Sequence, residues 1–399
     1  MPYYIGDVIQ DSGKLTARTV EKFREGGIDV RTHARVAAVD EERGTVHLDD
    51  GRQLPYDFLA LATGTQPLLP GIAGEDLEGV FVLKTLGDAL HIKRYIEETE
   101  CRRAIVVGAG FIGLEMCENM RARGIAVQMV HRGDLPAQRW DPDMGREILA
   151  ALENRGVDFL AQTRILSIEQ GTAYRLRLNT DHGPLEGDLI LLAVGVKPDA
   201  RLARDMGLAL GDSGAIRVNL SQQTSRENVY AVGDCAESYH RVSRRWVNIP
   251  LGDIANKQGR IAGSNIGGTP RLFPGIVGAQ SFRIFHMEAA ATGLNEKEAR
   301  ESGYTPVSAL LWGNAAANAM SEPKRLGMKL IADQSTGRLL GAQALGEAGA
   351  VGRINALSVA LWSGLTLEDV YNLDLAYSPP FGGSWDIIHN VARTLLQKR

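Results

Sequence analysis

The residues best suited to chemistry in this sequence are three closely spaced glycines, Gly108, Gly110 and Gly113. The first allows a tight turn, the second lets backbone approach a pyrophosphate, and the third lets a helix pack closely on a strand. Phe111 and Ile112 would open that helix, whose N–H groups and positive end suit phosphate. An apolar strand precedes the glycines and another follows the helix, which is the context a dinucleotide site requires. The pattern predicts a dinucleotide-binding β-α-β unit; a glycine-rich turn without a ligand is the alternative.

The second strand of this unit ends at His131 and Arg132, which bear on the nucleotide that is bound. An NAD site usually carries Asp or Glu here, about 20 residues after the first glycine, to hold the ribose hydroxyls. In this sequence the acid is missing and a cation is present, which favours a 2′-phosphate. The sequence therefore predicts NADPH as the cofactor. An exposed basic pair, with NADH also accepted, is the alternative.

Three further strands run into glycine turns, and these turns are weaker candidates for cofactor contact. They contain Thr63 and Gly64, Gly195, and Gly233 and Asp234. The Asp234 carboxylate could accept a hydrogen bond from a polyol hydroxyl, although an Asp after Gly is more often a turn residue. Alone, none of these turns identifies a ligand.

The three cysteines, Cys101, Cys117 and Cys235, form no close pair in the sequence. An odd and dispersed set is typical of a reducing compartment, so the sequence predicts a cytoplasmic protein. Cys117 falls within the helix after the glycines and is expected in the core. Cys235 follows Asp234, where a redox role is the alternative to an inert thiol, although no dithiol motif surrounds it.

Charge and hydropathy exclude several classes of protein. The 44 Lys and Arg against 48 Asp and Glu give a net charge of −4, which argues against a broad nucleic-acid surface. No apolar run reaches the length of about 18 residues that a membrane span needs. The first residues lack the basic and apolar regions of a signal peptide. We expect neither a nucleic-acid nor a membrane partner, and His spacing predicts no metal site.

The elements that must position these residues alternate between strands and helices over most of the chain. The expected strands are 29–32, 35–39, 45–48, 58–62, 104–107, 126–130, 189–193 and 229–232, and the expected helices are 14–24, 86–98, 111–123 and 251–266. From about residue 269, the expected strands are 281–285, 306–311, 327–332 and 339–345, and the expected helices are 350–363 and 386–396. Strands first and helices last indicate a separate α+β domain.

In their order along the chain, these motifs resemble the pyridine nucleotide–disulfide oxidoreductases. Within that family the chain is most similar to the branch of single-cysteine coenzyme A-disulfide reductases, NADH oxidases and NADH peroxidases. The resemblance covers nearly the whole chain and rests on segments 2–6, 62–64, 108–113, 224–234, 255–260 and 375–381. These motifs are specific for the family and much less specific for the substrate.

The resemblance implies an α/β fold with two Rossmann-like domains, for FAD and NAD(P), and a C-terminal α+β dimerisation domain. The FAD domain would be split in sequence between residues 1–97 and 201–268. The NAD(P) domain would occupy residues 98–200 between them, and the dimerisation domain would span 269–399.

Roles for single residues follow from the resemblance as well. Thr63, Gly64, Gly233 and Asp234 fall where the family contacts FAD, with Asp234 on the ribityl chain. The helix at 255–260 would lie beside the flavin.

On the nicotinamide side, Phe111 matches the aromatic residue that shields the pocket, and Glu115 matches the acid nearby. Tyr377 matches a tyrosine that reaches the active site of the partner subunit, so it is the catalytic candidate.

The chain departs from the family pattern at its start. The family begins with its own β-α-β unit, which carries a first set of glycines for FAD and then the redox-active Cys. In relatives, Cys-Gly and an apolar residue directly precede Pro-Tyr-Tyr, so the nucleophile would lie two residues before Met1. We therefore expect that Met1 is not the true start.

These expectations describe an FAD-dependent NAD(P)H oxidoreductase that passes hydride to flavin and electrons on to a small-molecule acceptor. The acceptor stays open among a disulfide, a polysulfide, a peroxide and oxygen. Two alternatives are a flavin electron-transfer reductase without a reactive cysteine and a truncated, non-catalytic nucleotide-binding chain. The long C-terminal domain argues against the first.

A homodimer is expected from the C-terminal part of the chain. The helix at 350–363 carries an apolar face, which predicts a surface in need of a partner. Its members are Ile354, Leu357, Ala360 and Leu361.

Overall fold

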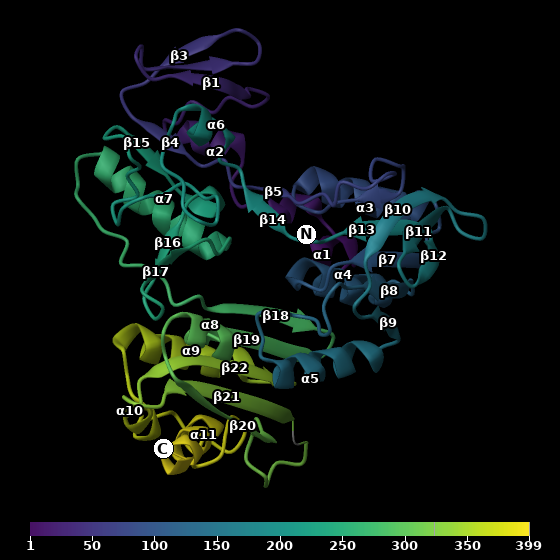
Figure 1. Cartoon of the computed structure of the whole chain (residues 1–399), viewed down its shortest axis with the longest axis vertical. Coiled ribbons are helices and arrows are strands. Elements are labelled where there is room, and N and C mark those ends of the chain that lie inside the picture. The colour runs from purple at the N-terminus through teal and green to yellow at the C-terminus, as the bar shows by residue number, and fades with distance from the viewer. Residues whose placement is uncertain (323, 399) are drawn as a thin grey trace.

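A parallel five-stranded sheet carries the 108–113 glycines at its carboxyl edge, as the β-α-β pattern predicts. The structure is a computed structural model that describes residues 1–322 and 324–398. The strand order is β6 (Val80–Phe81), β13 (Leu189–Leu192), β7 (Arg103–Val107), β8 (Ala126–Val130) and β9 (Val157–Leu160), all parallel. We call this sheet and the elements packed on it the central unit (Figure 1).

The two faces of the central sheet are covered differently, and successive residues of β7 show the division. Ala104 and Val106 belong to a core shared with helices, whereas Ile105 and Val107 belong to a core shared with a second small sheet. The helices are α3 (Leu86–Glu98), α4 (Phe111–Ala122) and α5 (Pro142–Glu153). The small antiparallel sheet consists of β10 (Ile165–Gln170), β11 (Leu176–Thr180) and β12 (Gly183–Gly187). Burial on both faces explains the unbroken apolar runs of β7 and β13.

A second unit, at the upper left of Figure 1, is built on two parallel strands. These are β4 (Leu59–Leu61) and β15 (Val229–Ala231). They are backed by α6 (Arg201–Asp205) and α7 (Gly252–Ile266). A hairpin of β16 (Ser238–His240) and β17 (Arg245–Val247) follows the short 3-10 turn η2 (Gly233–Cys235). An antiparallel sheet of β1 (Val36–Asp40), β2 (Thr45–Leu48) and β3 (Gln53–Pro55) extends outward.

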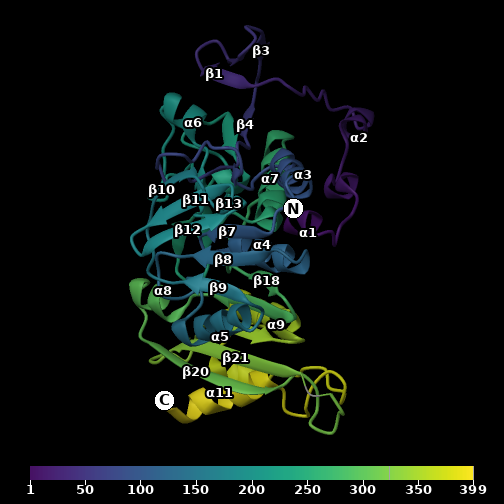
Figure 2. The ribbon, with the colours of Figure 1, turned by 90° about the vertical axis from the view of Figure 1, so that its right-hand side faces the viewer.

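Two antiparallel strands, β5 (Thr65–Pro67) and β14 (Val196–Pro198), run between the second unit and the central unit (Figure 1). The first residues of the chain form α1 (Pro2–Ile5), which packs on α3 and α4 of the central unit. The chain then runs through η1 (Ser12–Leu15) and α2 (Val20–Glu25) to β1, along one side of the molecule (Figure 2).

The C-terminal unit is an antiparallel five-stranded sheet with helices packed on it. The strand order is β18 (Gln280–Ile284), β19 (Met287–Gly293), β22 (Leu339–Gly346), β21 (Arg325–Asp333) and β20 (Pro306–Asn314). The helices are α8 (Glu296–Glu301), α9 (Ala350–Ser363), α10 (Leu367–Tyr371) and α11 (Ile387–Lys398). The helix α9 contacts β19 and β22, and α11 contacts β20 and β21. The fold is therefore α/β, with an α+β C-terminal unit.

Three expectations about elements are wrong. The expected helix at 14–24 is two short pieces, because Thr16 is extended and the Thr19 hydroxyl caps a new helix by accepting from the Lys22 N–H at 3.3 Å. Residues 29–32 form no strand because no neighbour pairs with them. The strand β19 was not expected, because its alanine-rich sequence has no alternation; pairing with β18 and β22 determines its conformation.

The apolar face expected to form a dimer surface on the 350–363 helix is covered within its own chain. The residues expected to seek a partner (Ile354, Leu357, Ala360 and Leu361) are each at most 2% exposed, in the core of their own chain. The opposite face of α9 is the open one, with Val359 at 66% and Trp362 at 41% exposure.

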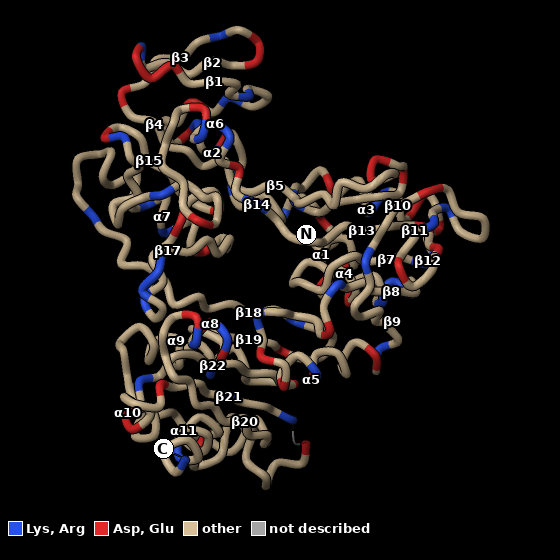
Figure 3. Tube along the Cα trace, in the orientation of Figure 1, with Lys and Arg blue, Asp and Glu red and all other residues tan. Residues whose placement is uncertain are grey.

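Lys and Arg are interspersed with Asp and Glu over all three units (Figure 3). Within the described part of the chain, no helix combines the length and apolar character needed to cross a membrane. No group of three or more His, Cys, Asp or Glu side chains among the described residues is arranged to hold a metal ion.

We predict that His240 makes stability depend on pH. Its ring is 2% exposed, Nδ1 accepts from the Ser243 N–H at 3.2 Å, and burial lowers its pKa from 6.5 to about 4. The unfolded chain binds this proton near pH 6.5 and the folded chain does not. Above pH 6.5, His240 leaves the free energy of unfolding unchanged. Between pH 6.5 and pH 4, it lowers that free energy by about 1.4 kcal/mol for each pH unit of acidification.

Urea denaturation between pH 4.5 and 7.5 measures this slope in the wild type and in His240→Gln, which should lose it. His182→Gln is the control, because His182 is 62% exposed. An identical slope in the wild type and His240→Gln would contradict the prediction.

Candidate functional site

Two of the three glycines in segment 108–113 are required by close backbone approaches in the central unit. Gly108 has φ +105°, and a Cβ there would lie 2.3 Å from the Ala193 carbonyl oxygen at the end of β13. A Cβ at Gly113 would lie 2.1 Å from the Gly108 carbonyl oxygen. Gly110, by contrast, has no other atom within 4 Å of a Cβ position, and it caps α4 without a side-chain hydrogen bond. The N-terminal amides of α4 thus adjoin open space that suits an anion.

Phe111 is supported by two aromatic residues that the sequence gave no reason to select. Its ring centroid lies 5.7 Å from that of Trp140, at 86°, and 5.1 Å from that of Phe282. Trp140 belongs to the segment that follows β8, and Phe282 belongs to β18 of the C-terminal unit. Ile112, next in the helix, is 37% exposed. The start of α4 is therefore packed against the C-terminal sheet on one side and open on the other.

Glu115 lies one turn further along α4 and is only partly exposed. Burial raises the pKa of its carboxyl; the Met1 ammonium opposes this shift, and the Glu118 carboxylate adds to it. Glu118 itself is paired, because the Arg283 guanidinium lies 2.6 Å from Oε1 and the Phe285 N–H donates to Oε2 at 2.9 Å. Glu115 forms no such ion pair with the described residues of the C-terminal unit, although the charge of Arg283 partly opposes the rise of its pKa. Its raised pKa suits a group that exchanges a proton.

His131 and Arg132 differ sharply in exposure. His131 is 8% exposed, its Nε2 lies 3.2 Å from Gln138 Nε2, and burial together with the charge of Arg132 lowers the pKa of its ring. The ring is therefore neutral and turned inward. Arg132 is exposed and forms no ion pair or side-chain hydrogen bond with any residue that the structure describes. Of the two, only Arg132 presents a positive charge at the surface.

The turns at Thr63 and Gly64 and at Gly233 and Asp234 lie side by side, because β4 and β15 are parallel neighbours and the Val232 N–H donates to the Leu61 carbonyl at 3.0 Å. The Thr63 hydroxyl donates to the Asp199 carbonyl at 2.5 Å. No other atom lies within 4 Å of a Cβ position at Gly64.

Asp234 Oδ2 accepts from Lys84 Nζ at 3.1 Å and from the Thr65 hydroxyl at 3.4 Å. Lys84 was missed in the sequence, where nothing sets it apart from other lysines.

A cavity of about 700 Å³ lies against β4, which has β15 as its only ladder partner among the described strands. Its lining includes Leu59–Leu61, Ala62, Thr63, Asp199 and Arg201. This cavity and the two glycine turns leave room for an extended ligand along the carboxyl ends of β4 and β15, as expected at parallel strand ends.

Gly195 is close to the 108–113 glycines and also to the crossover strands. Ala193, two residues before it, meets Gly108, and the Gly195 carbonyl accepts from the Leu68 N–H at 2.9 Å. Tyr377 joins neither group of glycine turns. It is 56% exposed in the segment after α10, near Phe381 at 77%.

All three cysteines are buried and unpaired. Cys235 Sγ lies 3.3 Å from the Val232 carbonyl and 3.5 Å from the Leu61 carbonyl, within the strand core. Burial raises the pKa of Cys101 to about 12 and raises that of Cys117 as well. None of the three is exposed, as a thiol used for redox chemistry is.

The fold and the glycine turns together define a two-site dinucleotide-binding protein with a C-terminal sheet domain. The chain matches the family described as pyridine nucleotide-disulphide oxidoreductase over residues 3–259, and the dimerisation domain of that family over residues 279–387. The chain belongs to this family of oxidoreductases.

Relatives with known names agree with this assignment. The NAD(P)H sulfur oxidoreductase (CoA-dependent) of Pyrococcus abyssi is 37% identical, over 98% of this chain and 88% of that protein. The NADH oxidase of Methanocaldococcus jannaschii is 32% identical, over 100% of this chain and 90% of that protein. The structure of an NAD-dependent persulfide reductase from A. fulgidus superposes with a TM-score of 0.96 at 33% identity, covering 100% of this chain and 75% of that one.

FAD and a nicotinamide nucleotide are the cofactors of this family, and residues of this chain fit both. The open side of Gly110 and the amides of α4 suit a pyrophosphate. Thr63, just after β4, lines the cavity beside that strand, and Gly64, the next residue, has no other atom within 4 Å of a Cβ position, which leaves room that an extended dinucleotide needs.

We predict that none of the three thiols of the folded protein reacts with Ellman's reagent near pH 8, because all are buried. Addition of guanidinium chloride should expose all three at once. Absorbance at about 412 nm measures both states. A thiol that reacts in the folded protein, and is lost in Cys235→Ser but not in Cys101→Ser, would show that Cys235 is accessible and would contradict this prediction.

Proposed function

We propose that this chain is an FAD-dependent NAD(P)H oxidoreductase that delivers electrons to a sulfur acceptor of the persulfide, polysulfide or low-molecular-weight disulfide class. The observation that carries the proposal is the pair of glycine-turn sites joined by β5 and β14, in a chain that belongs to this oxidoreductase family. The names of the relatives favour sulfur over oxygen, since the sulfur oxidoreductase is more similar to this chain than the NADH oxidase is.

The bound cofactors supply the hydride and electron transfer itself. The role proposed for Gly108, Gly110 and Gly113 is to bring backbone amides to the nicotinamide nucleotide. Phe111 would cover the nicotinamide, and Glu115, whose pKa is raised, would exchange a proton beside it.

On the flavin side, Thr63, Gly64, Gly233 and Asp234 would hold the flavin nucleotide. Lys84 offsets the charge of Asp234 and fixes its carboxylate. Gly195 would line the passage between the two sites, because it follows the Ala193 contact with Gly108 and accepts a hydrogen bond from Leu68, next to β5.

We further propose the division into residues 1–97 and 201–268 for FAD, 98–200 for NAD(P) and 269–399 for dimerisation. The match of residues 279–387 to the dimerisation domain supports a homodimer. Tyr377 and Phe381 are exposed within one chain, which suits a role at the site of a partner subunit. The unpaired thiols are compatible with the cytoplasmic location predicted from their number.

The flavin-loaded protein, reduced anaerobically with NADPH, tests the acceptor class. We expect polysulfide or coenzyme A disulfide to reoxidise the flavin faster than air-saturated buffer does, as followed by absorbance near 450 nm. Glu115→Gln should slow this turnover by about tenfold or more, because it removes a proton-exchanging group. Fast reoxidation by oxygen alone would instead assign the chain as an oxidase, and failure to bind FAD would reject both.

We predict a preference for NADPH that depends on Arg132. A charge-assisted hydrogen bond from this exposed guanidinium to the 2′-phosphate contributes about 1.5–3 kcal/mol, or about ten- to a hundredfold discrimination. His131, whose neutral ring is turned inward, adds little to this discrimination between NADPH and NADH. The ratio of kcat/KM for NADPH and NADH, in the wild type and in Arg132→Ala, measures the effect. Arg164→Ala is a matched control at another exposed arginine. Equal values for the two cofactors, unchanged by Arg132→Ala, would contradict the prediction.

A further inference from the structure

Residues 131–141, which we call the clamp loop, connect the end of β8 to α5 and pass the 108–113 glycines. The loop begins at His131 and Arg132 and ends at Trp140 and Asp141. Near its middle, the Ala137 N–H donates to the Ala109 carbonyl at 2.9 Å. Ala109 stands between Gly108 and Gly110, so the conformation of the clamp loop is linked directly to the turn that faces the nucleotide.

The clamp loop does not hold this conformation by itself. Ala137 has φ +53°, in the left-handed region that a residue with a Cβ adopts only when its surroundings enforce it. Trp140 is 4% exposed, and its indole N–H has no hydrogen-bond partner among the described residues. Its ring is positioned by packing alone, against Phe111 at 5.7 Å and Phe282 at 5.3 Å. The forces that fix the loop must therefore come from elsewhere.

Gln162 of the central unit holds the first half of the clamp loop, since its backbone N–H donates to the Gly133 carbonyl at 3.1 Å and its Nε2 donates to the Asp134 carboxylate at 2.5 Å. The C-terminal unit holds the other end of the loop. Gln343 on β22 binds Asp141 twice, since its Oε1 accepts from the Asp141 N–H at 3.0 Å and its Nε2 donates to the Asp141 carboxylate at 2.9 Å. The Glu296 N–H donates to the same carboxylate at 3.0 Å. Asn295 Nδ2 donates to the Arg139 carbonyl at 3.2 Å. Both backbone and side chain at this end are thus held by residues more than a hundred positions away.

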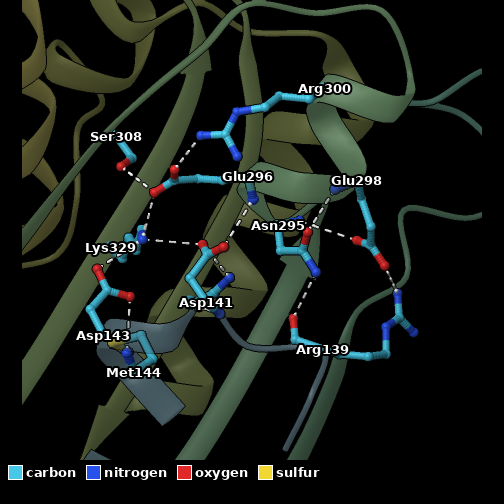
Figure 4. A network of polar contacts seen from close by, with 11 residues as sticks. Arg139, Asp141, Asp143, Met144, Asn295, Glu296, Glu298, Arg300, Ser308 and Lys329 are labelled. Carbon is cyan, nitrogen blue, oxygen red and sulfur yellow. Dashed lines mark hydrogen bonds and ion pairs between the residues drawn. The ribbon is translucent and has the colours of Figure 1, made fainter. Parts of the chain in front are cut away.

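A buried ammonium group completes this anchor (Figure 4). Lys329 on β21 has a side chain that is 3% exposed, and its Nζ lies 3.2 Å from Asp141, 2.8 Å from Asp143 and 2.8 Å from Glu296. These carboxylates come from the clamp loop, the first turn of α5 and the first turn of α8. One cation therefore ties the loop to three elements. Its removal would leave three carboxylates close together, with only Arg300, 2.8 Å from Glu296, as a remaining counter-charge.

We propose that Lys329 and Gln343 are positioning residues for the nicotinamide nucleotide. From the C-terminal sheet they hold the clamp loop, and through it Ala109 and Phe111, in the arrangement that receives the nucleotide. The proposal rests on the nucleotide site proposed above. Neither residue belongs to that site; both act through hydrogen bonds and ion pairs to Asp141.

The chain offers a matched control. Arg325, also on β21, pairs with Glu147 of α5 at 2.8 Å. This pair joins the same two units but does not touch the clamp loop. Arg325→Ala therefore loosens the contact between the units and leaves the loop anchored.

The test measures NADP⁺ binding to the flavin-loaded full-length protein by calorimetry, and kcat and KM for NADPH with ferricyanide as acceptor. In Gln343→Leu we expect the Kd and KM to rise about tenfold, the effect of losing a hydrogen-bonded anchor, with kcat within about twofold. Lys329→Met should show a larger rise, and Lys329→Arg should recover most of the affinity. Arg325→Ala should match the wild type. If Lys329→Met does not fold, the NADP⁺ affinity of Gln343→Leu decides the test.

Trypsin cleavage after Arg139, in protein without nucleotide, reports on the loop independently of activity. It should be faster in Gln343→Leu and Lys329→Met than in the wild type and Arg325→Ala. Folded variants that keep wild-type NADP⁺ affinity would overturn the inference, and so would an equal loss of affinity in Arg325→Ala. A wild-type protein that binds neither NADP⁺ nor NAD⁺ would instead overturn the proposed function, together with this inference.

Discussion

The contact between Lys329 and three carboxylates is the interaction on which the arrangement of this molecule depends. Taking an ammonium group and three carboxylates out of water is unfavourable unless their attraction and their hydrogen bonds compensate. Here burial opposes ionisation of Glu296, yet bonds from Lys329 and Ser308 lower its pKa to about 2. Burial raises the pKa of Asp141 in the same cluster, although Lys329 opposes that shift, so Glu296 is the carboxylate that the cluster holds firmly ionised. It lies beside the Phe111, Trp140 and Phe282 packing, so the central unit and the C-terminal unit meet through a polar and an aromatic contact together.

Local signals in the sequence were sufficient for the β-α-β unit, α3 and β13 of the central unit, whereas β6, α5, β9 and the sheet of β10, β11 and β12 were not expected. The strand before Gly108, the glycine spacing and the strand that ends at His131 lie within one short stretch, and each is a consequence of nearby backbone geometry. The structure confirms the β-α-β unit, as well as the expected helices over Leu86–Glu98 and Ala350–Ser363. The family assignment, made from the order of these motifs, is confirmed by the comparisons.

Long-range contacts account for what the sequence did not reveal. Lys329 stands within the apolar run 326–332 of β21, and its partner Asp143 is 186 positions away. Trp140 and Phe282, which support Phe111, are likewise far apart in the sequence. The strand β19 has an alanine-rich sequence whose conformation is determined by its two neighbours. The buried side of α9 was assigned to a partner subunit because periodicity alone does not tell which surface covers an apolar face.

The antiparallel pair of β5 and β14 bears on how proteins of this architecture evolve. Pro67 and Val196 are paired across this antiparallel ladder, so the segment between them begins and ends at one place (Figure 1). The helix α1 packs on the central unit from outside this segment. The segment is an insertion whose two ends are adjacent, the geometry that permits one domain to be spliced into another without disturbing the host. Besides this junction, the central unit keeps its contacts with the C-terminal unit through Lys329 and through the packing of Phe111 on Phe282. Replacement of that single stretch could alter the nucleotide that the protein accepts, while the host strands β4 and β15 keep their own pairing.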